Sequence, residues 1–140
     1  SLLRKPELWV YSNIETGSVP YASAESTFNR ISITERSKLK AELTSNYSGQ
    51  ISSSTNKQSN PGDSDSTNEY IAITILVATK KDLRLQNSAN IEVITEALRI
   101  LGSISSNDLI ALEVIWQPDG EGETLREEEL IIQYPNLKHL

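Results

Sequence analysis

Two runs of β-forming residues constrain the fold of this chain more than any other feature. Tyr70–Thr79 is apolar on both of its alternating faces, and Leu109–Trp116 has the same character. Such strands are typical of a sheet that is covered on both sides. Between them, the apolar spacing over Asn90–Leu101 predicts a helix, with Gly102 just past its end. Strand, helix and strand together predict a βαβ unit with parallel neighbouring strands and a right-handed crossover.

The first part of the chain predicts one strand and two helices. Leu8–Ile14 is rich in the aromatic and β-branched residues that strands favour. Pro20 fits the start of a helical stretch that runs to about Ser45. Within this stretch, Ser32 and Glu35 form a capping-box pattern, in which each side chain satisfies a free backbone N–H group of the other residue. We therefore expect a break at Ser32 and two short helices.

The C-terminal part adds a last helix and completes the predicted fold. Thr124–Glu127 is a second capping-box pattern, and the helix that it starts should end before Pro135. The sequence thus predicts an α/β or α+β fold with a small, three-stranded, largely parallel sheet. The expected order is β-α-α-β-α-β-α, with the helices packed on the sheet. The length of 140 residues fits a single domain over residues 1–140.

One segment inside this domain has a different composition. Ser48–Asn68 consists of small and polar residues, and Ile51 is its only large apolar residue. Such a segment buries too little surface to offset the entropy cost of ordering it. We expect a flexible polar loop at residues 48–68, disordered rather than functional.

The start of the chain suggests that something precedes it. The sequence begins at Ser1 and contains no Met, so we expect a C-terminal fragment of a longer chain. No apolar run approaches the roughly 20 residues that cross a bilayer. Any attachment to a membrane should therefore come only through the missing N-terminal segment.

Charge and cysteine content exclude several classes of function. The net charge of −6 opposes binding to nucleic acid, which requires clustered Lys and Arg. The absence of cysteine excludes disulfides, thiolate metal sites and a cysteine nucleophile. The partner that remains is another protein, and the oligomeric state is open.

The residues that could carry chemistry are few. His139 is the only histidine and lies next to the C-terminus, so it is a poor catalytic candidate. Glu113 interrupts an apolar strand, and a buried carboxylate there needs a partner, for which a simple ion pair or exposure is the favoured explanation. Asp119, Glu121 and Glu123 could join Glu113 as hard oxygen ligands for a divalent metal, but they lack the ligand order of an EF-hand.

No phosphate-binding glycine motif is present, and we predict no catalytic residue and no cofactor. The tryptophans Trp9 and Trp116 fit either a binding surface or packing in the core or at a sheet edge.

Several motifs together resemble a known family. They are Pro6-Glu7-Leu8-Trp9-Val10-Tyr11, Phe28-Asn29-Arg30-Ile31-Ser32 with Glu35-Arg36-Ser37-Lys38, Asn68-Glu69-Tyr70-Ile71, Leu112-Glu113-Val114-Ile115-Trp116 and Tyr134-Pro135-Asn136-Leu137. The chain resembles the family of the domain of unknown function 1517, found in cyanobacteria and in plastids. The resemblance supplies no catalytic residues. It implies a cyanobacterial or plastid location, with a preceding segment that holds the domain at a thylakoid membrane.

Two functional hypotheses follow. The first is a membrane-tethered, non-enzymatic domain that binds another protein through a sheet edge or a helix face and acts in assembly at a photosynthetic membrane. The alternative is a carboxylate-dependent hydrolase or a divalent-metal-binding domain built from Glu113, Asp119, Glu121 and Glu123 at the carboxyl ends of parallel strands.

Overall fold

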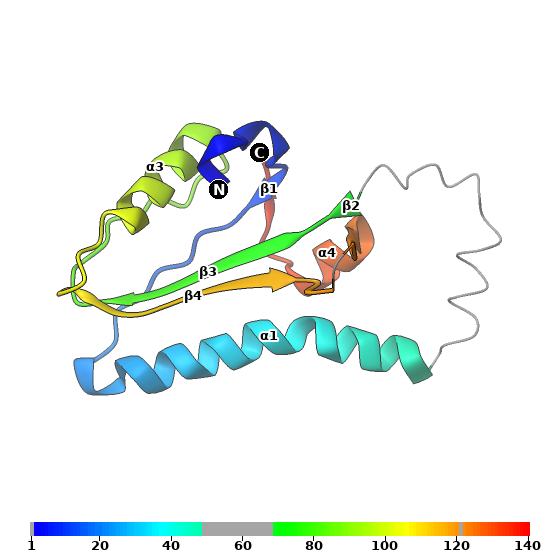
Figure 1. Ribbon diagram of the computed structural model, residues 1–140, viewed down its shortest axis with the longest axis horizontal. Coiled ribbons are helices and arrows are strands. Elements are labelled where there is room, and N and C mark those ends of the chain that lie inside the picture. Colours follow the sequence, from blue (N-terminus) through cyan, green and yellow to red (C-terminus); the bar gives the residue numbers. More distant parts are fainter. Residues whose placement is uncertain (1, 49–68, 121) are drawn as a thin grey trace.

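The computed structural model describes residues 2–48, 69–120 and 122–140. Its helices and strands are shown in Figure 1. In chain order they are β1 (Tyr11–Ser12), α1 (Ala24–Ser48), β2 (Glu69–Tyr70), β3 (Ala72–Thr79), α3 (Ile91–Gly102), β4 (Leu109–Gln117), β5 (Leu125–Arg126), α4 (Glu127–Gln133) and β6 (Lys138–His139). Three short 3-10 helices lie at Leu2–Arg4, Pro6–Leu8 and Tyr21–Ser23.

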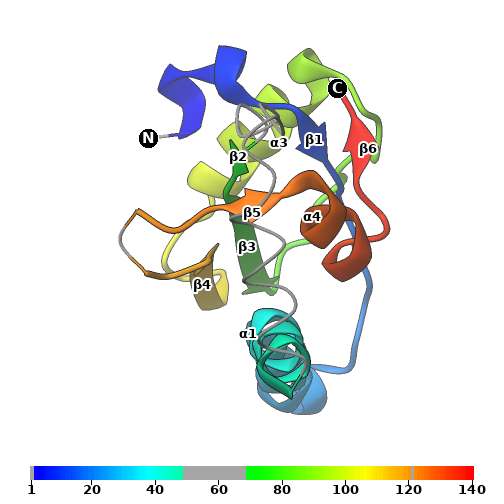
Figure 2. The ribbon, with the colours of Figure 1, turned by 90° about the vertical axis from the view of Figure 1, so that its right-hand side faces the viewer.

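The centre of the molecule is a long ribbon of two strands, β3 and β4, which run antiparallel. Their register pairs Ala72 with Gln117 at one end and Thr79 with Leu109 at the other. Helix α1 lies along one face of this ribbon, while α3 and the two terminal segments lie on the opposite side (Figures 1 and 2). The described strands form three antiparallel pairs, β1 with β6, β2 with β5 and β3 with β4. The predicted three-stranded, largely parallel sheet is therefore wrong, and so is the right-handed βαβ crossover.

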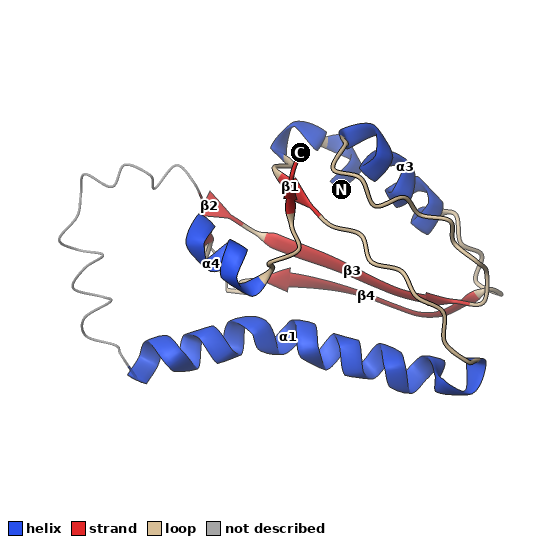
Figure 3. Ribbon diagram, turned by 180° about the vertical axis from the view of Figure 1, so that it is seen from behind, coloured by secondary structure: helices blue, strands red, loops and turns tan. Residues whose placement is uncertain are grey.

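The path between β3 and β4 explains why these strands are antiparallel. After Thr79 the chain first runs away from that end of the ribbon as an extended segment, and α3 then brings it back to the same end (Figure 3). Two hydrogen bonds close the loop: Lys80 N donates to Asp108 O at 2.8 Å, and Thr79 Oγ1 donates to the same oxygen at 3.1 Å. Parallel neighbouring strands require a connection that returns the chain to the opposite end of the ribbon. Here the extended segment and α3 run in opposite directions, so the chain enters β4 at the end where it left β3, and the two strands are antiparallel.

Helix α3 itself agrees with the sequence. The side chain of Asn90 accepts a hydrogen bond from Glu92 N at 2.8 Å and caps the helix. Ala97 is its buried residue, and the apolar spacing that predicted the helix is present over its full length. Local capping and periodicity were therefore sufficient to locate this element.

Helix α1 is continuous, so the predicted break at Ser32 is wrong. A 3-10 turn follows Pro20, and Ser23 N donates to Pro20 O at 2.8 Å before the α-helix begins. The hydroxyl of Ser32 bonds to the side chain of Glu113 on β4 and does not cap a second helix. The hydroxyl of Thr34 donates to Arg30 O one turn earlier, a bond that helix interiors accommodate. The tertiary contact thus overrides the local capping signal.

Short strands join the two ends of the chain. In the predicted strand Leu8–Ile14, only Tyr11–Ser12 is a strand, and it pairs with β6 near the C-terminus. Pro6–Leu8 is a 3-10 helix, as expected where proline presets the backbone. The hydroxyl of Tyr11 donates to Glu127 Oε1 on α4 at 2.5 Å and so ties the N-terminal segment to the last helix.

The last helix begins later than its sequence pattern predicted. It is Arg126, not Thr124, that occupies the cap, and its backbone N donates to Glu129 Oε1 at 3.3 Å. The helix ends at Gln133, before Pro135, as predicted. Nearly all of the polar segment 48–68 lies outside the described residues; Ser48 is the last residue of α1.

A small core joins β3, β5 and α4. Ala72, Leu125 and Leu130 are buried together, and four half-buried residues pack around them: Tyr11, Tyr70, Tyr134 and Leu137. The rings of Tyr11 and Tyr70 meet edge to face, with their centroids 5.8 Å apart. This core lies where the N-terminal and C-terminal segments meet, so it joins distant parts of the chain.

The core position of Leu130 gives a testable prediction. Leu130→Ala should lower the free energy of unfolding by about 2–4 kcal/mol, because Leu130 is only 3% exposed and its removal leaves a cavity. The matched control is Ile131→Ala in the same helix, where the side chain is 49% exposed and the loss should be below about 1 kcal/mol. Chemical denaturation measures both. Equal losses would contradict this description of the core.

Candidate functional site

The densest polar cluster lies between α1 and β4. In β4, Glu113, Ile115 and Gln117 face α1, and Ile115 among them is buried. Glu113, Gln117 and their partners form what we call the polar network: Ser32, Glu35, Arg36, Lys38, Glu113, Gln117 and Tyr134. Side chains from one helix, one strand and the segment after α4 meet here, and this convergence makes the network the first place to look for function.

Glu113 forms the first half of the network. Its carboxylate accepts hydrogen bonds from the hydroxyl of Ser32 and from the guanidinium of Arg36, one on each oxygen. Arg36 Nε also donates to Ser32 Oγ at 3.3 Å, which closes a triangle of three polar groups. The expected ion pair at Glu113 is therefore confirmed, with Arg36 as the partner. Since Ser32 is buried, its hydroxyl holds the helix against the strand and is not open to a substrate.

Gln117 forms the second half. Gln117 is buried, with only 6% of the residue exposed. Nε2 donates to the main-chain oxygens of Glu35 at 3.0 Å and Arg36 at 3.3 Å, and Oε1 accepts from the hydroxyl of Tyr134. A buried amide without such partners would destabilise the fold, so this arrangement fixes how α1 and the C-terminal segment meet β4.

Tyr134 and Lys38 complete the network. Lys38 Nζ lies 3.0 Å from Glu35 Oε2 and 4.6 Å from the centre of the Tyr134 ring. Burial of the phenol, followed by the nearby charge of Glu35, raises the pKa of Tyr134 to about 12. The hydroxyl therefore stays protonated and remains a hydrogen-bond donor to Gln117 at neutral pH.

The remaining sequence candidates lie apart from the network. Asp119 and Glu123 follow β4 in the turn after Pro118, and Glu121 lies outside the described residues. Within residues 2–48, 69–120 and 122–140, no cluster of three or more His, Asp or Glu side chains is arranged to hold a metal ion. Because β3 and β4 are antiparallel, the expected gathering of these carboxylates at the carboxyl ends of parallel strands does not apply.

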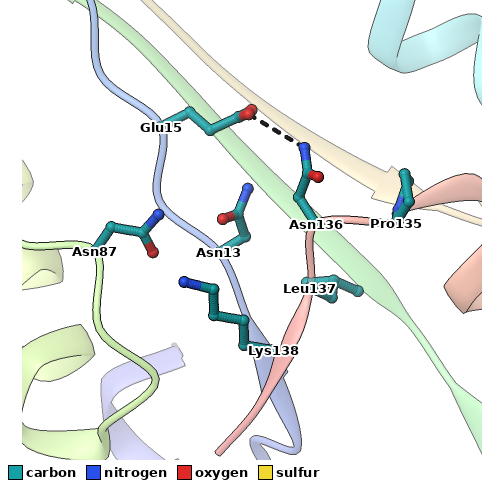
Figure 4. Close-up of a pocket in the computed structure, with 7 residues that line it drawn as sticks. All are labelled: Asn13, Glu15, Asn87, Pro135, Asn136, Leu137 and Lys138. Atoms are coloured by element: carbon teal, nitrogen blue, oxygen red, sulfur yellow. Dashed lines mark hydrogen bonds between the residues drawn. The ribbon is translucent and has the colours of Figure 1, made fainter.

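A second polar feature is an open pocket of about 440 Å³. Its lining comes from three distant segments, as Figure 4 shows: Asn13, Glu15, Asn87, Pro135, Asn136, Leu137 and Lys138. Asn136 Nδ2 donates to Glu15 Oε1 at 3.3 Å, and Asn87 Oδ1 accepts from Ile14 N at 3.4 Å. The first bond ties the N-terminal segment to the C-terminal one, and the second ties it to the stretch before α3. His139 lies nearby in β6, with its ring 5.2 Å from that of Tyr11.

Sequence reasoning singled out Glu113 but missed its partners. Glu113 and Gln117 are four residues apart on a strand, and an even spacing places both on one face. Ser32 and Arg36 are also four apart, which places them on one face of a helix. Two polar pairs at these spacings were the available signal for a helix facing a strand.

The fold and the polar network define a small α+β domain in which a long helix is held on a two-stranded ribbon by buried polar contacts. The family model of the "Protein of unknown function (DUF1517)" matches residues 1–140, and the chain belongs to this family. The resemblance seen in the sequence is thereby confirmed.

Two relatives extend this assignment. The chain is 38% identical over 143 residues to "Protein FLAP1 homolog A" of Synechocystis, a match that covers 99% of this chain and 43% of that protein. It is 35% identical over 142 residues to "FLUCTUATING-LIGHT-ACCLIMATION protein 1, chloroplastic" of Arabidopsis thaliana, covering 100% of this chain and 35% of that protein. The chain thus spans less than half the length of these relatives, which come from a cyanobacterium and a chloroplast. No solved structure matches it.

The network predicts the effect of losing one hydroxyl. Tyr134→Phe should lower the free energy of unfolding by about 1–2 kcal/mol, because the buried oxygen of Gln117 loses its donor. Tyr21→Phe is the matched control, since Tyr21 is exposed and the change should cost less than about 0.5 kcal/mol. Denaturant titrations of both variants measure the difference. A Tyr134→Phe variant as stable as the control would remove Tyr134 from the network.

Two tyrosines predict how stability depends on alkaline pH. The hydrogen bond to Glu127, with burial as the next cause, raises the pKa of Tyr11 to about 12, the same value that Tyr134 reaches. An unfolded tyrosine ionises near pH 10, so the folded state binds these two protons more strongly. This contribution to stability is complete below about pH 10 and should disappear as the pH rises towards 12.

The check is a set of denaturant titrations between pH 9 and 11.5, compared with the variant that carries both Tyr11→Phe and Tyr134→Phe. The loss of stability should be steeper in the unsubstituted chain. Parallel curves for the two proteins would contradict the assignment.

Proposed function

We propose that this chain is a non-enzymatic protein-interaction module, which acts at a photosynthetic membrane in cyanobacteria or plastids. The observation that carries the proposal is an exposed apolar strip on β4. We call it the outer strip, and it consists of Leu112, Val114 and Trp116, which are 56%, 46% and 55% exposed.

The outer strip lies on the face of β4 that points away from α1. Opposite these residues, across the ribbon, are Val77, Ile75 and Ile73 of β3. The β3 residues are half-buried, whereas those of β4 are exposed, so one side of this apolar face is covered and the other is open. Contiguous apolar surface of this kind is characteristic of sites that bind other proteins.

The opposite face of the ribbon, which is covered by α1, also supports a non-enzymatic function. There the polar groups of Glu113 and Gln117 are committed to α1 and to Tyr134. A catalytic site needs polar groups that are directed at a substrate, whereas these groups are directed at one another. The chemistry on that face is structural, which leaves the outer strip as the surface available for function.

The setting of the proposal rests on the relatives. One is chloroplastic, and its name refers to acclimation to fluctuating light. No helix in the described part of the chain is long and apolar enough to cross a membrane. We therefore assign contact with a thylakoid membrane to protein outside this chain, and we assign binding of a protein partner to the outer strip.

The test is photo-cross-linking in cyanobacterial cells that express the full-length protein. A photoreactive amino acid replaces Val114 in the outer strip, and the matched control places it at Glu96, an exposed position on α3. We expect a discrete cross-linked protein from position 114 in the membrane fraction that is absent from position 96. Mass spectrometry then identifies it.

A second variant guards against accidental capture. Adding Leu112→Ser and Trp116→Ser should remove the cross-link at position 114 while leaving the amount of protein unchanged, because both side chains are already half in solvent. Identical patterns at positions 114 and 96, or a cross-link that survives both serine substitutions, would contradict the proposed function.

A further inference from the structure

We propose that the partner on β4 is a second copy of this chain, and that two copies pair their β4 strands edge to edge into one four-stranded antiparallel sheet. This inference rests on the proposed function, since it names the partner whose side chains lie beside the outer strip. The sheet would have the order β3-β4-β4-β3, with a twofold axis at its centre.

The first argument is that β4 has an unprotected edge. Among the described residues, β3 is the only strand that pairs with β4, so the other edge of this nine-residue strand has no strand beside it. Natural edge strands are usually protected by outward charges, proline, bulges or a covering element. The only charged residue of β4 is Glu113, which points towards α1 and is paired with Arg36. Proline appears only after the strand, at Pro118.

The other edge of the ribbon is less suited to pairing. The residues of β3 from Ile73 to Thr79 are half-buried. The register shift near Ala78 leaves its extra residue, Ile110, on β4, so the regular part of the β4 edge is Ala111–Gln117. In the end-on view of Figure 2, α1 lies below β3, and β4 forms the outer side of the ribbon. A strand from another molecule therefore has access to β4.

The second argument is that β4 is complementary to itself. The outer strip, which consists of Leu112, Val114 and Trp116, is apolar throughout. A twofold axis perpendicular to the sheet pairs even-numbered residues with even-numbered ones, so the two outer strips form one continuous apolar surface. An axis at Val114 places Leu112 opposite Trp116 of the second copy and keeps the two Glu113 carboxylates out of direct opposition.

The third argument is the distribution of charge along the ribbon. The end at Thr79 has an excess of positive side chains, with Lys80, Lys81 and Arg84 against Asp82 and Asp108. The end at Gln117 has an excess of negative ones, with Glu69, Asp119 and Glu123 against Arg126. Antiparallel pairing brings the positive end of each copy next to the negative end of the other, which favours this orientation.

The size of the contact sets the expected strength. The regular part of β4, Ala111–Gln117, is about 24 Å long, and its pairing adds roughly six main-chain hydrogen bonds. We expect the surface area buried on each copy to be below the roughly 800 Å² per partner of a standard stable interface. We therefore expect a dimer with a dissociation constant in the micromolar range.

The chain offers a clean test, because it contains no cysteine. Single substitutions Val114→Cys and Leu112→Cys probe the twofold axis, and Glu96→Cys on α3 is the matched control. Directly opposed residues in antiparallel strands have Cα atoms about 4.5–5.5 Å apart, which suits a disulfide. In the purified 140-residue chain under mild oxidation, Val114→Cys should form a covalent dimer about tenfold or more faster than Glu96→Cys, because pairing raises the effective thiol concentration.

Sedimentation equilibrium over a range of concentrations provides the second measurement. The unsubstituted chain should change from monomer to dimer in the micromolar range. Val114→Lys should remain monomeric, and below the dissociation constant its melting curve should match that of the unsubstituted chain, since residue 114 is exposed. Cross-linking no faster than the Glu96→Cys control, together with a monomer at all concentrations, overturns the second copy as partner. If position 114 still captures a different protein in cells, the proposed function stands without the dimer; if it captures none, both fall.

Discussion

The contact between α1 and the β3–β4 ribbon is the interaction on which the rest of the structure depends. A ribbon of two strands has marginal stability in water and needs a covering element. Helix α1 supplies that cover, with Ile115 of β4 buried beneath it. The bonds of Glu113 and Gln117 then fix one position of the helix along the strand, because sliding would leave a half-buried charge and a buried amide without partners. Apolar burial supplies the attraction, and the polar network supplies the register.

The parts of the fold that sequence predicts well are those that local rules determine. Helix α3 has an Asn cap and a regular apolar period, and both act within a few residues. The direction of β4 relative to β3 depends instead on the extended stretch after Thr79, whose path is set by what it packs against and not by its own sequence pattern. At Ser32 the capping signal was real but lost to a bond with Glu113, a residue 81 positions away. Local patterns therefore gave the elements, and long-range contacts decided their arrangement.

In the candidate site, too, a local pattern identified one residue, whereas long-range contacts determined its partners. Glu113 could be singled out because a carboxylate in an apolar strand requires a partner, but nothing in the strand says that Arg36 is that partner. The motifs that carry the family resemblance meet here: Glu35 to Lys38 on α1, Glu113 on β4 and Tyr134 before Pro135. Motifs far apart in sequence that converge on one network are explained by a shared structural requirement, and so they do not by themselves indicate catalysis.

The two faces of the ribbon therefore carry different constraints. On the α1 face, Gln117 bonds to main-chain oxygens of the helix at 3.0 and 3.3 Å, so no side-chain change on the helix can compensate for the loss of its amide. On the outer face, Leu112, Val114 and Trp116 are exposed and do not hold α1 in place. Exposed leucine, valine and tryptophan carry a risk of aggregation. Polar residues in these positions would cost the monomer little stability and would remove that risk. The apolar strip is thus best explained by a contact that the isolated chain does not contain.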